Sequence, residues 1–295
     1  MNPIKVIISD KFDAEGVSLL RSQKDFEVIY KESGYKKEEL MPLIDQVEGL
    51  IIRSATRVDK ELLTKAKNLK LVIRAGVGVD NIDIEEASRH GVVVMNSPGG
   101  NSVSTAEHAL CLLLSLARKI PQAHMSMKSG KWEKSKFSGT ELTGKTLGVI
   151  GLGRIGKEVV KRAKGLSMNV IGYDPFIPES RLAELEIEIT TKEKLLSQSD
   201  FITVHAPLTE ATKHIINRSN LSLLKDGVGL INCARGGIYE EEAVLEGIRS
   251  KKISGCAFDV FDIEPLPSDS PLLKEESIIL TPHLGASTAD AEFAV

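Results

Sequence analysis

A glycine-rich segment near the middle of the chain has the spacing of a nucleotide-binding turn, Gly151-Leu152-Gly153-Arg154-Ile155-Gly156. An apolar run, Thr146 to Ile150, comes directly before it, and a stretch with helical spacing follows; G-x-G-x-x-G requires this strand and helix context. Glycine at these positions permits a tight turn and lets the backbone approach a pyrophosphate, while the helix N-terminus attracts negative charge. The segment therefore predicts a dinucleotide-binding site.

An acidic residue, Asp174, ends the next predicted strand, where its carboxylate can accept hydrogen bonds from both hydroxyls of the adenine ribose. The same carboxylate would repel a 2′-phosphate, and Pro175, Phe176 and Ile177 supply no neighbouring cation to bind one. The sequence therefore predicts NAD rather than NADP as the cofactor.

Three later predicted strands each run into a segment with an ionisable side chain. Arg235 follows the first of these strands, Glu264 follows the second, and His283 follows the third. Functional residues of open parallel sheets gather at the carboxyl ends of the strands. We therefore expect the three side chains to converge beside the nicotinamide.

These three residue types suit the oxidation of a 2-hydroxy acid. A histidine can remove the hydroxyl proton near neutral pH as a hydride leaves the same carbon. A carboxylate beside the ring favours the imidazolium and fixes its orientation, and a guanidinium can bind the substrate carboxylate and polarise the reacting oxygen. We therefore predict His283 as the acid or base, Glu264 as its partner and Arg235 as the arginine that binds substrate.

The elements that must position these residues alternate between short apolar strands and stretches with helical spacing. This alternation predicts α/β units with parallel sheets. Near-continuous apolar runs favour strands that are buried on both faces. A long helix is expected from Ser102 to Lys119. A polar, extended arm without helix or strand periodicity, Gln122 to Lys145, follows it with Trp132 as a packing anchor, and a second unit comes after the arm. The predicted strands are Ile4–Ser9, Phe26–Tyr30, Gly49–Ile52, Leu71–Ile73, Val92–Met95, Leu147–Ile150, Asn169–Tyr173, Phe201–His205, Gly229–Asn232, Gly255–Asp259 and Ile278–Leu280.

Composition narrows the class of protein further. The chain has 295 residues, enough for two domains, and 38 basic against 41 acidic residues give a net charge of −3, so no general attraction to nucleic acid or to a membrane surface is expected. The three cysteines are too few and too widely spaced for a disulfide framework, and no metal site is predicted. The apolar run Ala109 to Ala117 is too short to span a bilayer, and charges at Lys5, Asp10 and Lys11 argue against a signal peptide. We expect a cytoplasmic protein.

The chain resembles the D-isomer-specific 2-hydroxyacid dehydrogenases over nearly its whole length. The segments that carry the resemblance are Arg74-Ala-Gly-Val-Gly-Val-Asp-Asn81, Gly151 to Gly156, His205-Ala-Pro-Leu-Thr209, Asn232-Cys-Ala-Arg-Gly-Gly237, Phe258-Asp-Val-Phe261 and Pro282-His-Leu-Gly-Ala-Ser-Thr288.

The resemblance implies an α/β fold of two Rossmann-like, doubly wound parallel-sheet domains that flank an active-site cleft. Residues 1–99, joined by 286–295, would bind substrate, residues 100–285 would bind NAD, and a homodimer or homotetramer would form through the long helix and the arm. The catalytic trio would be Arg235, Glu264 and His283. Cofactor contacts are expected from Val77, Gly151, Gly153, Arg154, Ile155, Gly156, Asp174, Ala206, Cys233, Ala234, Arg235, Asp259, His283, Gly285 and Ala286.

Two arginines bear on which hydroxy acid is the substrate. Arg53 and Arg74 each end a predicted strand of the first unit, and a dianionic phosphate is better matched by several cations than by one. The branch of the family that oxidises D-3-phosphoglycerate places phosphate-binding arginines at both positions and another on the arm of a neighbouring subunit, where this chain has Lys134. The expected substrate is therefore a small phosphorylated 2-hydroxy acid.

Two alternatives remain open on the sequence. One is a reductase of hydroxypyruvate, glyoxylate or another 2-keto acid, and the other is a corepressor-like binding protein that senses NADH. The resemblance also predicts a closing helix beyond Ala291–Val295 and, without a further domain, no feedback regulation by serine.

Overall fold

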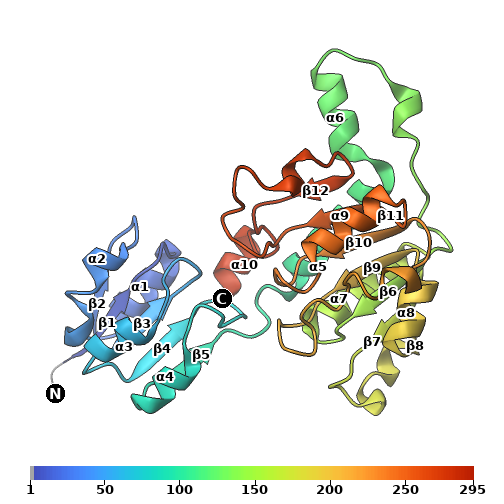
Figure 1. The fold of residues 1–295 in the computed structure, drawn as a ribbon. Coiled ribbons are helices and arrows are strands. Elements are labelled where there is room, and N and C mark those ends of the chain that lie inside the picture. The colour runs from blue at the N-terminus through green and yellow to red at the C-terminus, as the bar shows by residue number, and fades with distance from the viewer. Residues whose placement is uncertain (1–2) are drawn as a thin grey trace. The chain divides into compact units, whose positions relative to one another are not determined.

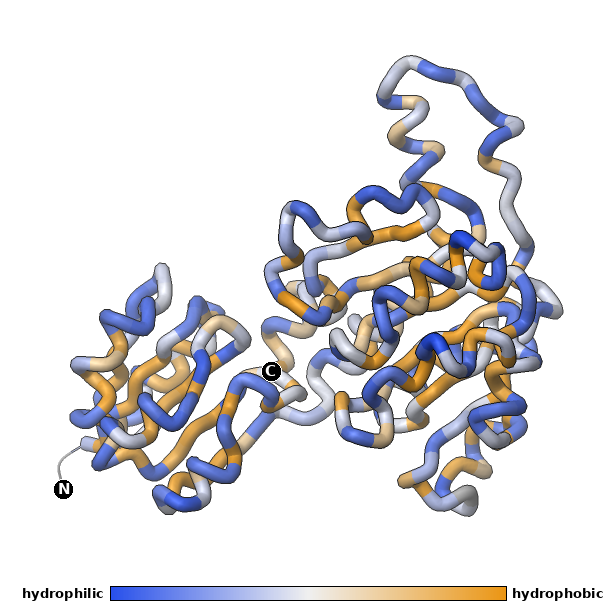
Figure 2. The backbone as a smooth tube through the Cα atoms, viewed as in Figure 1, coloured by the Kyte–Doolittle hydropathy of each residue, from blue (hydrophilic) through white to orange (hydrophobic). Residues whose placement is uncertain are grey.

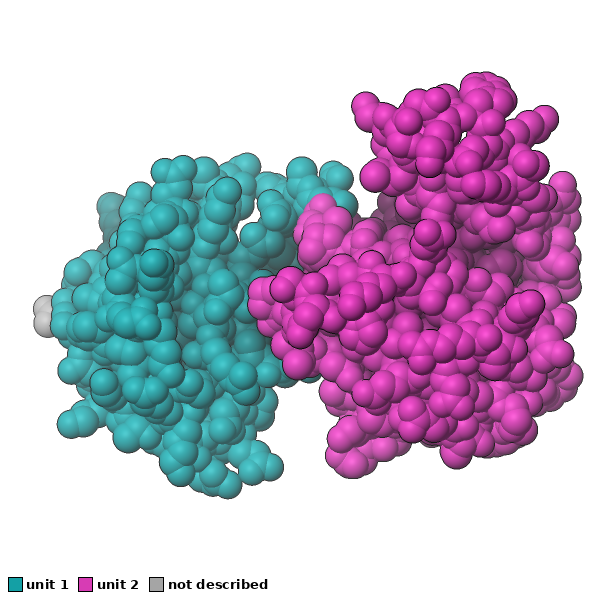
Figure 3. Space-filling view, turned by 45° about the horizontal axis from the view of Figure 1, so that its top comes forward, with its two compact units in different colours: residues 1–101, 288–295 teal, residues 102–287 magenta. Residues whose placement is uncertain are grey.

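The computed structural model describes residues 3–295, and the chain forms two compact α/β units. Unit 1 comprises residues 1–101 and 288–295, and unit 2 comprises residues 102–287 (Figure 3). Each unit contains one parallel sheet, so the predicted fold class is confirmed. Every predicted strand is present, with bounds that agree to within a residue or two. Across residues 3–295, no helix has the length and apolar character needed to cross a bilayer.

Unit 1 is built on a five-stranded sheet in the order β2-β1-β3-β4-β5 (Figure 1). The strands β1 and β3 in its interior consist mainly of buried aliphatic side chains, which explains their unbroken apolar pattern. The elements are β1 (Ile4–Ile8), β2 (Phe26–Tyr30), β3 (Gly49–Ile52), β4 (Leu71–Arg74), β5 (Val93–Asn96), α1 (Ala14–Ser22), α2 (Lys37–Leu40), α3 (Lys60–Lys65), α4 (Ile84–Arg89) and α10 (Ala289–Ala294).

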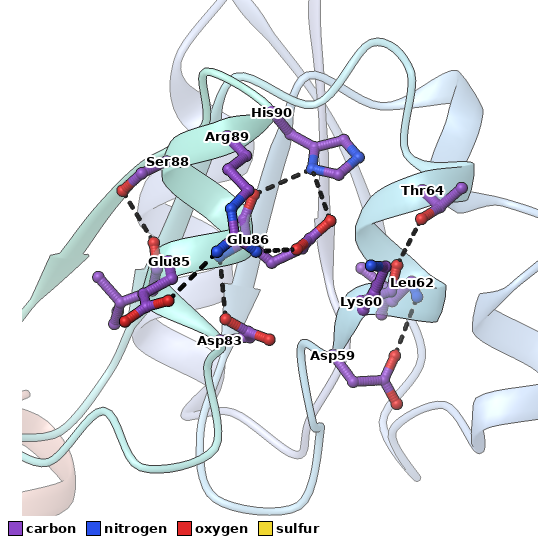
Figure 4. A network of polar contacts seen from close by, with 11 residues as sticks. Asp59, Lys60, Leu62, Thr64, Asp83, Glu85, Glu86, Ser88, Arg89 and His90 are labelled. Atoms are coloured by element: carbon purple, nitrogen blue, oxygen red, sulfur yellow. Dashed lines mark hydrogen bonds and ion pairs between the residues drawn. The ribbon is translucent and has the colours of Figure 1, made fainter.

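Aspartates fix the starts of α3 and α4 in unit 1 (Figure 4). The carboxylate of Asp59 accepts a hydrogen bond from the Leu62 amide at the start of α3, and Asp83 accepts one from the Glu86 amide at the start of α4, each at 2.9 Å. Glu86 is buried, and its carboxylate pairs with Arg89 at 2.7 Å one turn later, which offsets the cost of burying that charge.

Unit 2 is built on a seven-stranded sheet in the order β12-β11-β10-β9-β6-β7-β8. Apolar residues concentrate along its strands in Figure 2, and the helices α5 and α7 pack against each other and the sheet. The strands are β6 (Thr146–Ile150), β7 (Asn169–Tyr173), β8 (Glu188–Ile189), β9 (Phe201–Val204), β10 (Val228–Asn232), β11 (Ile253–Phe258) and β12 (Ile278–Leu280). The helices are α5 (Ser102–Arg118), α6 (Ile120–Lys128), α7 (Arg154–Gly165), α8 (Lys192–Gln198) and α9 (Glu241–Arg249).

The arm differs from its sequence-based description in one respect. Its first part is helical, because Lys119 adopts a left-handed conformation that ends α5 and Pro121 then occupies the first turn of α6, where proline is favoured. Trp132 follows α6 and is 81% exposed in the single chain. Any burial of its ring would therefore need a second molecule.

Candidate active site

The glycine-rich turn between β6 and α7 has the geometry of an anion site. Gly151 has a φ of +87°, and a Cβ at Gly156 would overlap the carbonyl oxygen of Gly151, so both glycines are needed for the turn itself. Among the described residues, no heavy atom beyond the chain neighbours lies within 4 Å of a Cβ built on Gly153, and no side chain caps α7. The amides at the start of α7 and the open space at Gly153 fit the pyrophosphate of a dinucleotide.

Asp174 joins the end of β7 to this turn. Its Oδ2 atom accepts a hydrogen bond from the Leu152 amide at 2.9 Å, and its Oδ1 atom accepts one from the Phe176 amide at 2.9 Å and one from the Ile177 amide at 3.2 Å. Oδ2 keeps acceptor capacity for a ribose hydroxyl. Asp174 therefore also shapes the loop in which it lies, a role that sequence spacing did not predict.

His283 and Glu264 form a hydrogen-bonded pair, with His283 Nδ1 at 2.8 Å from Glu264 Oε2. The hydrogen bond to Glu264 raises the pKa of His283. Burial would raise the pKa of Glu264, but hydrogen bonds from His283 and the Phe261 amide outweigh burial and lower it. An ionised Glu264 accepts a hydrogen bond from the Nδ1–H of His283, so the neutral ring presents Nε2 with a free lone pair, which can accept a proton.

Arg235 follows β10, on a loop that packs against the loop carrying Glu264. A Cβ at Gly236 would overlap the carbonyl oxygen of Phe261, and the Gly237 amide donates to Asp262 Oδ1 at 2.6 Å. The charge of Arg235 is close enough to lower the pKa of both Glu264 and His283. The structure thus brings the three predicted catalytic side chains together at the carboxyl ends of β10, β11 and β12.

Asp259 lies at the end of β11 and organises the His283 loop. Its side chain is 1% exposed, and its carboxylate accepts hydrogen bonds from the Leu284 amide at 2.7 Å and the Gly285 amide at 2.8 Å. The backbone carbonyl of Asp259 accepts the His283 amide at 2.9 Å. His283 has a φ of +55°, an uncommon conformation for a residue other than glycine, which these contacts impose.

The remaining predicted cofactor residues of unit 2 lie on the same edge of the sheet. Burial raises the pKa of the Cys233 thiol, which disfavours the thiolate. Ala234 is buried and donates its amide to Asn232 Oδ1 at 3.0 Å, while Ala206 packs partly buried against the core. Ala286 follows the Asp259-bound Gly285 along the chain.

Arg53 lies in unit 1 on a loop that is fixed from two sides. The buried carboxylate of Asp10 accepts the Arg53 amide at 2.6 Å, and the Asn81 side chain donates to the Arg53 carbonyl at 2.8 Å. The Arg53 guanidinium pairs with Glu292 of α10 at 3.4 Å. The sequence did not predict Asp10 and Asn81 as site residues. Asp10 directly follows a predicted strand, and that position is the signal that could have identified it.

Arg74 ends β4 in unit 1, and its side chain folds over Gly76. Gly76 has a φ of +149°, and a Cβ there would overlap the Arg74 guanidinium, so only glycine leaves room for it. Val77, also in unit 1, accepts a hydrogen bond from the Asn96 side chain at 2.7 Å through its carbonyl. Lys134 lies in unit 2, at the start of a short 3₁₀ turn in the arm.

Residues 110–285 match the sequence model of the NAD binding domain of the D-isomer specific 2-hydroxyacid dehydrogenases. The chain belongs to this family. The cofactor that this domain binds in the family is NAD. Asp174 and the glycine-rich turn predicted the same cofactor.

Named relatives in the family agree with this assignment. The D-3-phosphoglycerate dehydrogenase of Archaeoglobus fulgidus is 48% identical over 292 residues, which cover 99% of this chain and 55% of that protein. The chain thus spans about half the length of most of the curated relatives it matches. The hydroxypyruvate reductase of Thermotoga maritima is 45% identical over 98% of this chain and 93% of that protein. The crystal structure of a protein from Thermus thermophilus superposes with a TM-score of 0.89 at 32% identity, covering 99% of this chain and 94% of the other.

Proposed function

We propose that this dehydrogenase oxidises D-3-phosphoglycerate to 3-phosphohydroxypyruvate with NAD, the first step of the phosphorylated route to serine. The observation that carries the reaction class is the 2.8 Å contact between His283 Nδ1 and Glu264 Oε2, beside Arg235 in the NAD-binding unit. The choice of substrate is supported by the names of several relatives and by Arg53 and Arg74.

The side chains of unit 2 have distinct roles in this proposal. Arg235 binds the substrate carboxylate and polarises the oxygen that becomes a carbonyl. His283 takes the hydroxyl proton on Nε2, and Glu264 holds the ring and stabilises the imidazolium that forms. NAD, when bound, accepts the hydride from the same carbon, so one proton and one hydride leave the substrate together. The glycine-rich turn and Asp174 hold the pyrophosphate and the ribose.

The substrate phosphate is assigned to Arg53 and Arg74 of unit 1, with Lys134 from the arm of a partner chain. Lysine keeps the positive charge at that position but lacks the two-pronged geometry of arginine, so its contact would be less specific. A phosphate at Arg53 would compete with Glu292, whose carboxylate lies 3.4 Å from one nitrogen of the guanidinium. The substrate-binding domain in this proposal is residues 1–99 with 286–295, and the NAD domain is 100–285.

We further propose that the chain works in the cytoplasm as a homodimer or homotetramer, without nucleic acid or membrane partners. A groove of about 1010 Å³ lies in the arm, with Met127, Trp132 and Phe137 among the residues that line it. Aromatic and thioether side chains that are exposed, as Trp132 and Met127 are, or partly exposed, as Phe137 is, are typical of protein contacts. Sedimentation of the chain and of the Trp132→Ser variant would test this assembly, because the variant should lose the larger species.

A second candidate is the reduction of hydroxypyruvate. It is favoured by the hydroxypyruvate reductase of Thermotoga maritima, because the match with this chain covers 93% of that protein. The same His283 and Glu264 pair would then deliver a proton in place of removing one.

One assay separates these candidates. NADH formation is followed with D-3-phosphoglycerate, D-glycerate and D-lactate, and NADH consumption with 3-phosphohydroxypyruvate, hydroxypyruvate and glyoxylate, each also tested with NADP or NADPH. Turnover confined to the phosphorylated pair and to NAD supports phosphoglycerate oxidation. A preference for unphosphorylated hydroxypyruvate would replace it with the reductase, and NADH binding without any turnover would favour a nucleotide-sensing protein.

A further inference from the structure

A histidine on helix α5 contacts the loop that carries His283, and the proposed mechanism gives it no role. His108 Nε2 lies 3.1 Å from Asp259 Oδ1 and 3.3 Å from Thr281 Oγ1. The His108 side chain is 19% exposed. We propose that His108 is a positioning residue, which holds His283 in its working geometry through the carboxylate of Asp259. This inference rests on the proposed role of His283 in proton transfer.

The direction of each hydrogen bond follows from the charge on Asp259. Burial would raise the pKa of Asp259, but hydrogen bonds from His108, Thr281 and the Leu284 amide outweigh burial and lower it. An ionised carboxylate only accepts, so His108 Nε2 carries the hydrogen, and the Thr281 hydroxyl donates its own to the same oxygen at 2.6 Å. The oxygen lone pairs of Thr281 then remain for the N–H of His108.

The opposite side of the carboxylate is bonded to the residues next to His283. Oδ1 also accepts the Leu284 amide, Oδ2 accepts the Gly285 amide, and the carbonyl of Asp259 accepts the His283 amide. The two residues after His283 therefore depend on the orientation of the Asp259 carboxylate, and His283 itself is bonded to the backbone of Asp259. Without the His108 donor, Oδ1 loses one of its three partners, and the carboxylate can turn toward those that remain.

Helix α5 supports this loop at a second point, one turn earlier. Thr105 is buried on the same face of the helix as His108, because residues three apart lie together on a helix surface. A Cβ built on Gly285 would lie 3.4 Å from Thr105 Cγ2 and 3.2 Å from Asp259 Oδ2. Helix α5 thus packs against the loop that carries His283, and His108 makes the polar contact between them.

His283 is sensitive to such a displacement because of its backbone. Its φ of +55° is an uncommon conformation that the surrounding structure must hold, so a loosened loop can relax away from it. The 2.8 Å contact with Glu264 would then lengthen, and His283 Nε2 would move relative to the substrate hydroxyl. Displacements of about 1 Å in an active site can lower the rate by about 100-fold.

The test compares two substitutions at His108 in the intact chain. His108→Gln keeps an N–H donor near the Nε2 position, whereas His108→Leu removes the donor at similar volume. We expect His108→Leu to lower kcat by roughly 10-fold to 100-fold with little change in KM, and His108→Gln to restore most of kcat. His90→Gln, at the end of α4 and outside the arm, is the control for loss of an imidazole and should keep the kcat of the parent.

Two measurements on the chain without cofactor or substrate separate positioning from general stabilisation. Amide exchange of Leu284 and Gly285 should accelerate in His108→Leu but not in His108→Gln, and the NMR titration of His283 should move to lower pH as its contact with Glu264 weakens. If His108→Leu does not fold, His108→Asn takes its place, because its shorter amide does not reach Asp259.

Parent-like exchange at Leu284 and Gly285 together with a parent-like titration of His283 in the donor-less variant would overturn the proposal. So would equal loss of kcat in His108→Gln and His108→Leu. If the parent oxidises none of the hydroxy acids, the proposed function fails. The exchange and titration measurements still decide the role of His108 in that case.

Discussion

The amide of His283 and the carbonyl of Asp259 are joined by a 2.9 Å hydrogen bond between the ends of two neighbouring strands, β12 and β11. Asp259 directly follows β11, the strand that leads to Glu264, so this backbone contact ties the loop of the base to the loop of its carboxylate partner. The ring of His283 then needs only one further contact, at 2.8 Å, to reach Glu264.

Replacing Glu264 with glutamine should change the pH dependence of oxidation. Glu264 raises the pKa of His283, so loss of its charge should move the rising limb of kcat, which reports the neutral imidazole, to lower pH. The maximal kcat should fall by about 100-fold, because the imidazolium formed in the reaction loses its counter-charge. Profiles of kcat against pH check this. Glu276→Gln, an exposed acid nearby in the chain, serves as the control, and an unmoved limb would contradict the pairing.

The same pair predicts a window of stability. The pKa of His283 is raised on folding, so its stabilisation is present at low pH and is lost as pH rises through the folded value. The pKa of Glu264 is lowered, so its stabilisation is present above the unfolded value and is lost as pH falls through the folded one. The difference in urea midpoint between parent and Glu264→Gln should therefore be largest between the two folded pKa values. A difference that is independent of pH would argue against ionisation of both partners.

His205 should make the chain sensitive to acid. Burial lowers its pKa from 6.5 to about 3, so the folded state keeps the ring neutral while the unfolded chain binds a proton below pH 6.5. Stability is therefore full above 6.5 and falls as pH drops toward 3, by up to about 1.4 kcal/mol per pH unit. His205→Gln should flatten this slope in urea unfolding at several pH values, while His124→Gln on exposed α6 should leave it unchanged.

Two glycines of the nucleotide turn should respond differently to alanine. Gly153→Ala places its Cβ in open space, so melting should stay close to the parent while the affinity for NADH falls by about tenfold. Gly156→Ala overlaps the carbonyl oxygen of Gly151, so it should lower the melting temperature by several degrees. Thermal melts and NADH fluorescence titrations separate the two effects, and equal melting of both variants would refute the distinction.

Gly76→Ala should act like a substitution of Arg74. Its Cβ would overlap the guanidinium, so the arginine must move from its position over the backbone. We expect KM for D-3-phosphoglycerate to rise by about tenfold with kcat nearly constant, because a binding contact used equally in ground and transition states is lost. Gly91→Ala is the matched control, since Gly91 also has positive φ (+69°) and no heavy atom of the described residues approaches its Cβ within 4 Å. An unchanged KM would remove Arg74 from phosphate binding.

Local spacing in the sequence predicted the α/β fold class and NAD correctly, and the resemblance carried by its motifs predicted the family correctly. The strands carry unbroken apolar runs because both faces are buried, and the glycine-rich turn lies within a contiguous strand and helix. The predicted trio could be named because each residue follows a strand. Their roles, and those of Arg53 and Arg74, stay predictions.

Contacts between distant parts of the chain could not be predicted in the same way. His108 lies within a helix whose pattern marks only its apolar face, and its partner Asp259 is 151 residues away. Asp10 reaches Arg53 across 43 residues. The helix α6 was missed because its start depends on one left-handed residue, Lys119, which has no distinctive sequence signal.

The division of residues between the two units has an evolutionary consequence. Arg235, Glu264 and His283 all belong to unit 2, whereas Arg53 and Arg74 belong to unit 1. On the proposed assignment, the bond-making chemistry and the choice of substrate are encoded by separate modules. Substitutions in unit 1 could therefore adapt an ancestral enzyme to a new acid while its hydride and proton transfer remained intact, and a chimera carrying the unit 1 of a relative should acquire that relative's preference.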